Sequence, residues 1–224
     1  MNPTKLAITG ALVGALCVSL AARDAHGDAA PCPAWDVDYL LAANLELRDT
    51  PVGAGDGQYK IGPGNMTLRF EDRGGLPAGR AKLMTYTMRE SFQIVSKNLF
   101  WTTTVTTDTR TAATPDRCWS AAEGMLDGRT LKWSTPVRGY HTDGTLTCDG
   151  SLCGKFGAPP AGTSDLRIAP HDVTLGPLAY GEDGKTFKMA STFVTKTDMP
   201  KQTGYLTLAA RELRRTCVQP KPCP

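Results

Sequence analysis

Apolar and polar residues alternate with a period of two along much of this chain. The clearest stretch is 37–47, where every second position is apolar: Val37, Tyr39, Leu41, Ala43, Leu45 and Leu47. Because successive side chains of a strand point to opposite faces, this pattern predicts a strand with one apolar face. Helical spacing would scatter the same residues around the axis and break the stripe.

The same alternation predicts further strands, at 66–71, 84–94, 99–105, 131–133, 145–148, 166–168, 173–178, 187–193 and 205–208. Asp-Gly pairs predict tight turns at 56–57, 127–128, 143–144, 149–150 and 183–184, and Gly62-Pro63-Gly64 predicts a loop. We therefore expect an all-β fold, either an antiparallel β-sandwich or a small β-barrel. Two short helices are expected, near 117–125 and 209–215.

The N-terminal residues have the layout of a secretory signal peptide. A short basic segment precedes the apolar run 6–22, and the small residues Ala25 and Gly27 precede an expected cleavage point. The predicted organisation is a signal peptide over 1–27, a single all-β domain over 28–217 and a Pro-rich tail over 218–224. The expected location is secreted or periplasmic, and the alternative is a membrane anchor that stays attached. No later segment is apolar enough to predict a membrane-spanning helix.

The cysteines support the same location. Cys17 lies in the apolar run, and an even set follows it: Cys32, Cys118, Cys148, Cys153, Cys217 and Cys223. Such a set predicts three disulfides in an oxidising compartment. Cys148 and Cys153 flank an Asp-Gly turn and are expected to pair. Cys32 is expected to pair with Cys217 or Cys223, and Cys118 with the other.

Charge and motifs give little evidence for a partner or cofactor. The chain has 25 Lys and Arg against 22 Asp and Glu, so nucleic acid is not an expected partner. One tight basic group, Arg211, Arg214 and Arg215, is interpreted as a solvated edge, with an anion site as the alternative. There is no P-loop, dinucleotide fingerprint, C-x-x-C pair or H-E-x-x-H. We expect no cofactor and no metal.

Two histidines lie close to acids, in the pairs His141 with Asp143 and His171 with Asp172. A general base oriented by a carboxylate would use such residues, with a serine as nucleophile: Ser91, Ser134, Ser151 or Ser164. No serine lies in a G-x-S-x-G elbow, so catalysis by either histidine is the less favoured hypothesis. Candidate carboxylates for glycoside hydrolysis, otherwise interpreted as a solvated face, are Asp36, Asp38, Glu46, Glu71, Glu90 and Glu123.

Large apolar side chains allow a further hypothesis. In a barrel, Met84, Tyr86, Met88 and Phe187 would line an interior able to hold a small apolar ligand. In a sandwich the same residues would fill the core. The preferred function is a secreted or periplasmic, non-catalytic all-β binding or structural domain of unknown ligand. The alternatives are a hydrolase using His141 or His171, and a β-barrel carrier of an apolar ligand.

Overall fold

The structure is a computed structural model, and every element that it describes is a β-strand. The described residues are 32–49, 56–73, 76–96, 100–111, 120–155, 158–194 and 203–219. The predicted signal peptide over 1–27 lies outside these ranges, as does most of the predicted tail over 218–224, so both stay predictions.

Eleven strands make up the described fold. Their bounds are β1 Ala34–Arg48, β2 Gly57–Arg73, β3 Leu76–Ser96, β4 Trp101–Arg110, β5 Ala122–Asp127, β6 Thr130–Trp133, β7 Val137–Gly150, β8 Gly162–Val173, β9 Leu178–Tyr180, β10 Thr186–Val194 and β11 Thr203–Val218.

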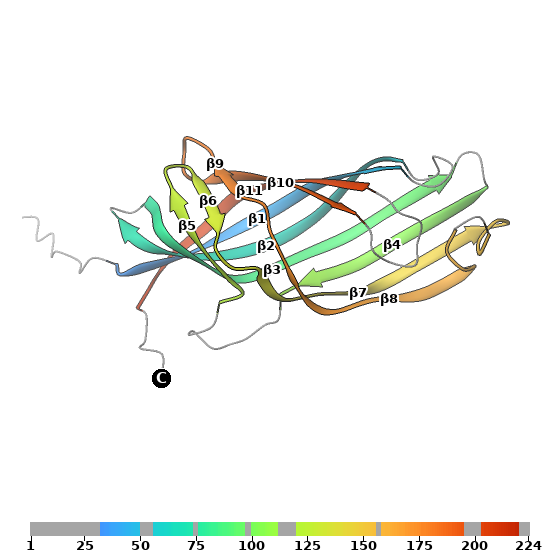
Figure 1. The fold of residues 1–224 in the computed structure, drawn as a ribbon, viewed down its shortest axis with the longest axis horizontal. Coiled ribbons are helices and arrows are strands. Elements are labelled where there is room, and N and C mark those ends of the chain that lie inside the picture. The colour runs from blue at the N-terminus through green and yellow to red at the C-terminus, as the bar shows by residue number, and fades with distance from the viewer. Residues whose placement is uncertain are drawn as a thin grey trace, which may run out of the picture. The chain divides into compact units, whose positions relative to one another are not determined.

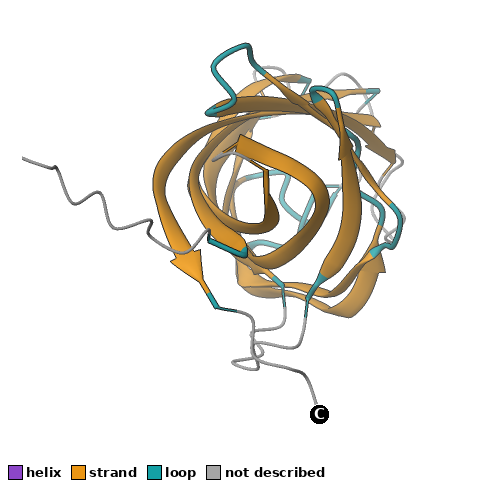
Figure 2. Ribbon diagram, turned by 90° about the vertical axis from the view of Figure 1, so that its left-hand side faces the viewer, coloured by secondary structure: helices purple, strands orange, loops and turns teal. Residues whose placement is uncertain are grey.

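Eight of the strands form a closed antiparallel barrel. Their order is β2-β1-β11-β10-β9-β6-β5-β3, and the pairing of β2 with β3 completes the ring (Figures 1 and 2). The barrel is thus the observed form of the predicted all-β fold. Because the first strand of the domain pairs with the last, the ring joins segments from both ends of the described chain.

The long strand β3 belongs to two parts of the sheet. Its first half pairs with β5 through Gly79–Leu83, and its second half pairs with β4 through Thr87–Ser96. From β4 the sheet continues through β7 to β8, which is the edge strand. These three strands extend one side of the wall, while β5, β6 and β9 complete the ring at the opposite end (Figure 1).

The predicted alternation describes the core well. The six apolar positions predicted for the inner face of β1 are all at most 6% exposed. They pack with side chains from β2 and β10 such as Phe70 and Phe187, each 1% exposed. Burying one such side chain contributes about 1.5–3 kcal/mol, so this shared interior is the main source of stability.

Met84 is an exception among the residues predicted to face inward. The register between β2 and β3 pairs Thr67 with Thr85 but Leu68 with Leu83, which leaves Met84 as an extra residue. A bulge of this kind reverses the alternation locally. Leu83 therefore takes the fully buried position and Met84 is only partly buried.

Both predicted helices are wrong where the structure describes them. Residues 122–125 lie in β5, and residues 209–215 lie inside β11; residues 117–119 are outside the described ranges. Ala and Leu favour helices locally, but residues 209–215 pair with β1, apart from the extra residue Leu213. Cross-strand pairing and burial of Ala210 thus outweigh local propensity.

The turn predictions are correct where glycine is needed for a hairpin. Gly128 and Gly184 have φ of 56° and 63° and lie in the β5–β6 and β9–β10 connections. Asp143-Gly144 is different, because it lies within β7 and a Cβ at Gly144 would collide with the Thr106 carbonyl oxygen on β4. Gly62-Pro63 also lies within a strand, opposite a register shift of β1.

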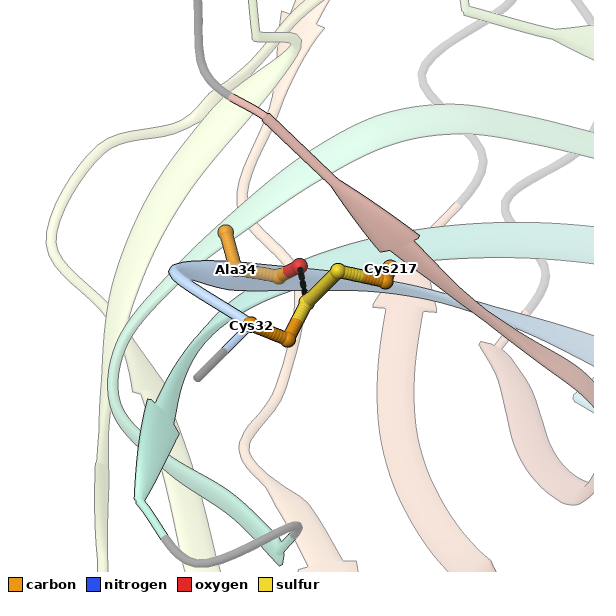
Figure 3. The surroundings of a disulfide bond; sticks show 3 residues. All are labelled: Cys32, Ala34 and Cys217. Atoms are coloured by element: carbon orange, nitrogen blue, oxygen red, sulfur yellow. Dashed lines mark hydrogen bonds between the residues drawn. A yellow bond between two sulfur atoms is a disulfide. The ribbon is translucent and has the colours of Figure 1, made fainter. Parts of the chain in front are cut away.

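Two disulfides join described residues. Cys32 and Cys217 tie the start of β1 to β11, with Cα atoms 5.8 Å apart (Figure 3). Cys148 and Cys153 close the turn after β7, with Cα atoms 5.9 Å apart. Both bonds agree with the predicted pairings. The remaining predicted partners, Cys118 and Cys223, lie outside the described residues.

Candidate functional site

His141 and Asp143 lie on the outward face of β7, within a cluster of arginines. Arg110 Nε donates to His141 Nε2 at 2.8 Å, and Arg110 and Arg167 each form an ion pair with Asp143, at 3.1 Å and 3.3 Å. His141 Nδ1 lies 3.1 Å from the Gly139 carbonyl oxygen, which assigns the proton to Nδ1. Because Arg110 occupies the Nε2 lone pair, this geometry is that of a surface polar cluster and gives His141 no free basic nitrogen.

His171 and Asp172 do not form a pair. They are consecutive residues of β8, so their side chains point to opposite faces. His171 Nδ1 lies 2.9 Å from the Ala169 carbonyl oxygen, and its ring meets the Tyr140 ring edge-on at 5.8 Å. Neither histidine is hydrogen-bonded to a serine among the described residues. The hydrolase hypothesis therefore gains no support from this geometry.

Three of the candidate carboxylates lie on the outer face of β1. Asp36 accepts two hydrogen bonds from Arg69, at 2.7 Å and 2.9 Å. Asp38 accepts from Thr67 and Arg214, and Glu46 pairs with Arg48 at 2.7 Å. Each carboxylate has a cationic partner, so this face is an ion-paired strand surface.

Glu90 is the one candidate carboxylate that the described structure places on the inner face of the sheet. It lies on β3 between Met88, which is 3% exposed, and Phe92, which packs against the core. Thr107 of β4 donates a hydrogen bond of 3.0 Å to Glu90 Oε2. Burial raises the pKa of this carboxyl, although the bond from Thr107 opposes that effect.

Two tyrosines lie close to Glu90 on the inner side. The rings of Tyr86 on β3 and Tyr140 on β7 are 5.8 Å apart. Burial raises the pKa of Tyr140 to about 12 and that of Tyr86 well above its usual value, and the negative charge of Glu90 adds to both shifts. Both phenols are therefore neutral at physiological pH.

Threonines add further polar groups beside Glu90, Tyr86 and Tyr140, along the inner face of β4. Thr103, Thr107 and Thr109 are 2–3% exposed, and Thr109 exchanges a 2.9 Å hydrogen bond with Thr142 of β7. Thr103 differs from the others because its buried hydroxyl has no hydrogen-bond partner within the described ranges. An unsatisfied buried hydroxyl costs roughly 1–3 kcal/mol, so Thr103 is an unusual feature of this interior.

The interior differs between the two ends of the sheet. At the end formed by β5, β6 and β9, the inward residues Leu83, Leu131 and Leu178 are 0% exposed. At the end formed by β4, β7 and β8, Ile168 is 41% exposed although its inward neighbour on β7, Thr142, is 6% exposed. Phe92, Ile94 and Leu166 are also only partly buried on this inner face. We refer to Glu90, Phe92, Ile94, Leu166 and Ile168 as the inner site.

The filled end contains its own polar group, but that group is paired. Leu213 is an extra residue of β11 at the register shift opposite Asp38 and Tyr39. This bulge brings Glu212 and Arg215 to the same face, where they form a 2.8 Å ion pair that is 13% and 19% exposed. Arg214, which belongs to the same predicted basic group as Arg215, forms an ion pair with Asp38 outside the barrel. The arginines of this group therefore have different partners.

The Glu212–Arg215 pair lies near two buried phenols. The hydroxyls of Tyr39 and Tyr180 are 3.3 Å apart, and burial raises the pKa of Tyr39 to about 12. A recess of about 160 Å³ indents this end beside Tyr180, with the Arg129–Glu182 ion pair on its rim. The inner site at the other end differs because, in the part of the chain that the structure describes, Glu90 has no such cationic partner.

The sequence contained a signal for Glu90 that the alternation pattern alone did not identify as functional. Residues 86, 88, 92 and 94 are apolar or aromatic and share one parity, and Glu90 is the charged residue within that series. A charge on an otherwise apolar strand face marks a position that needs a partner. What the sequence could not provide is the neighbour across the sheet, Thr107.

Within the described ranges, no group of three or more His, Cys, Asp or Glu side chains is arranged to hold a metal ion. The same residues include no helix of the length and apolar character needed to cross a membrane. Comparisons with protein-family models, with curated proteins and with solved structures return no match to this chain.

Proposed function

We propose that this chain is a non-catalytic binding protein of an oxidising compartment, secreted or periplasmic, which holds a small and largely apolar ligand at the inner site. The observation that carries the proposal is the exposure of inward apolar side chains at one end of an otherwise filled interior. Small-molecule sites are concave and mostly apolar, with a few polar groups that fix orientation. The inner site offers the apolar side chains Phe92, Ile94, Leu166 and Ile168 beside the polar carboxyl of Glu90.

The disulfides support the proposed compartment. Intramolecular bonds such as Cys32–Cys217 persist where no thiol system reduces them, as outside the cytosol. The apolar leader predicted over 1–27 agrees with the same location. The hydrolase alternative stays a prediction, and an enzyme of that kind would lose turnover on His141→Ala or His171→Ala.

The test uses an uncharged fluorescent probe, N-phenyl-1-naphthylamine, titrated into the oxidised protein. The variant Ile168→Asp places a charge at the inner site, and Ala169→Asp places the same charge one residue away on the opposite face of β8. Binding of the probe would remove hydrating water from the new carboxylate, which is costly. We therefore expect Ile168→Asp to raise the dissociation constant of the probe by about tenfold or more.

Ala169→Asp is the matched control and is expected to leave the dissociation constant within about twofold, since it does not face the inner site. Two results would refute the proposal. The first is a wild-type protein that fails to bind the probe. The second is an equal loss of affinity in the two variants, which would place the probe elsewhere.

A further inference from the structure

The inward-facing carboxyl of Glu90 differs in its partners from Glu212, the acid on the inner face of β11. Among the residues that the structure describes, no Lys, Arg or His side chain forms an ion pair with Glu90. The hydrogen bond from Thr107 is neutral and engages Oε2. By contrast, Glu212 has Arg215 at 2.8 Å in the filled end.

The difference between Glu90 and Glu212 is informative because a carboxylate without a cationic partner is costly inside a protein. A partly buried carboxylate loses hydration, and a cation at hydrogen-bonding distance is what ordinarily restores that lost stabilisation. The titratable neighbours on β3 and β7, Tyr86 and Tyr140, are phenols, and their negative forms would only repel the carboxylate. Glu90 is therefore poised for a positive group that the described chain does not supply.

A second observation points to a ligand on the same inner face. The hydroxyl of Thr103 is buried and has no hydrogen-bond partner among the described residues. Thr103 faces inward on β4, beside Ile94 of the inner site, with which it pairs across the sheet. An oriented polar atom without a protein partner next to an exposed apolar surface is typical of a site that a ligand completes.

We infer that the ligand of the inner site is an amphipathic amine, whose protonated nitrogen pairs with Glu90 and whose apolar body lies along Phe92 and Ile94. This inference rests on the proposed function and adds the chemical class of the ligand. An ammonium group donates to carboxylate oxygens in short, charge-assisted bonds, about twice as strong as neutral ones. A neutral or anionic head of the same size would leave Glu90 without its counter-charge.

The test compares three probes of equal chain length by isothermal titration calorimetry at pH 7: decylamine, decanol and decanoate. Decylamine is protonated at this pH, decanol is neutral and decanoate is negative. For the wild-type protein we expect decylamine to bind about tenfold or more tightly than decanol, and decanoate to bind most weakly.

Two variants locate the preference. Glu90→Gln keeps the shape and the bond from Thr107, so decanol should bind within about twofold of wild type while the preference for decylamine disappears. Glu123→Gln, which removes an outer-face carboxylate of β5, is the matched control and should keep the preference. A wild-type protein without preference, or a preference that persists in Glu90→Gln, overturns the inference but leaves the binding proposal intact. Failure of all three probes to bind overturns both.

Discussion

The two described disulfides differ greatly in the length of chain that they close, and this difference predicts their contributions to stability. The Cys32–Cys217 bond spans 185 residues and the Cys148–Cys153 bond spans 5. In the chain-entropy treatment, a cross-link restricts the unfolded state more strongly as its loop lengthens. It gives about 5 kcal/mol for the long loop and about 2 kcal/mol for the short one.

The perturbation is a pair of double variants, Cys32→Ala with Cys217→Ala and Cys148→Ala with Cys153→Ala. The free energy of unfolding is measured in guanidinium chloride, with tryptophan fluorescence as the readout. We expect the first double variant to lose about 3 kcal/mol more than the second. Its denaturant slope should also rise, because a chain freed of the long cross-link exposes more surface on unfolding.

Packing alone predicts the opposite order of stability losses for the two double variants, so the measurement distinguishes the two explanations. Cys148 is 2% exposed and Cys32 is 9% exposed, so truncation should leave the larger packing defect at the short bridge. An equal loss in both double variants, or a larger loss on removing Cys148 and Cys153, would refute the argument from loop length.

Two further predictions concern packing and pH. Leu68 is 0% exposed and Leu213 is 53% exposed, so Leu68→Ala should lower the free energy of unfolding by about 2–5 kcal/mol and Leu213→Ala by under about 0.5 kcal/mol. Chemical denaturation measures both, and similar losses would contradict the assignment of Leu213 to an exposed bulge. Burial raises the pKa of Glu90 above the ordinary value of a glutamate, so the folded protein holds this proton more tightly than the unfolded chain. The resulting stabilisation is fully present below the unfolded pKa and is lost as the pH rises through the folded pKa. The neighbouring titratable groups, Tyr86 and Tyr140, titrate far above this range. As the pH rises from 4 to 7, the free energy of unfolding of the wild type should therefore fall relative to that of Glu90→Gln. A difference between the two proteins that stays constant over this range would show that Glu90 is not desolvated.

The sequence predicted the strands better than it predicted their arrangement. A period of two identifies a face on each strand, which is why the inner positions of β1 were correct from Val37 to Leu47. The choice between sandwich and barrel depends on whether β2 pairs with β3 and β1 with β11, and no local pattern contains that information. The helix predicted at 209–215 failed for the same reason, since its partner strand is far away in sequence.

Bulges account for the finer errors. An extra residue at Met84 or Leu213 shifts the parity of the residues after it, and neither position carries a glycine or proline that would have indicated it. His141 has an acid two residues away in the sequence, but Arg110 and Arg167 reach its cluster from other strands. The surroundings of Glu90 include Thr107 of β4, a neighbour that no local pattern identifies.

The pairing of β1 with β11 also affects when this domain can fold. The ring closes only when β11, residues 203–218, pairs with β1, residues 34–48. The ribosome must therefore synthesise nearly the entire domain before the barrel can form. Native contacts of such long range form slowly, because the loop between them must be ordered before they stabilise anything. The hairpin of β2 and β3 can form during synthesis, whereas closure of the ring must follow it.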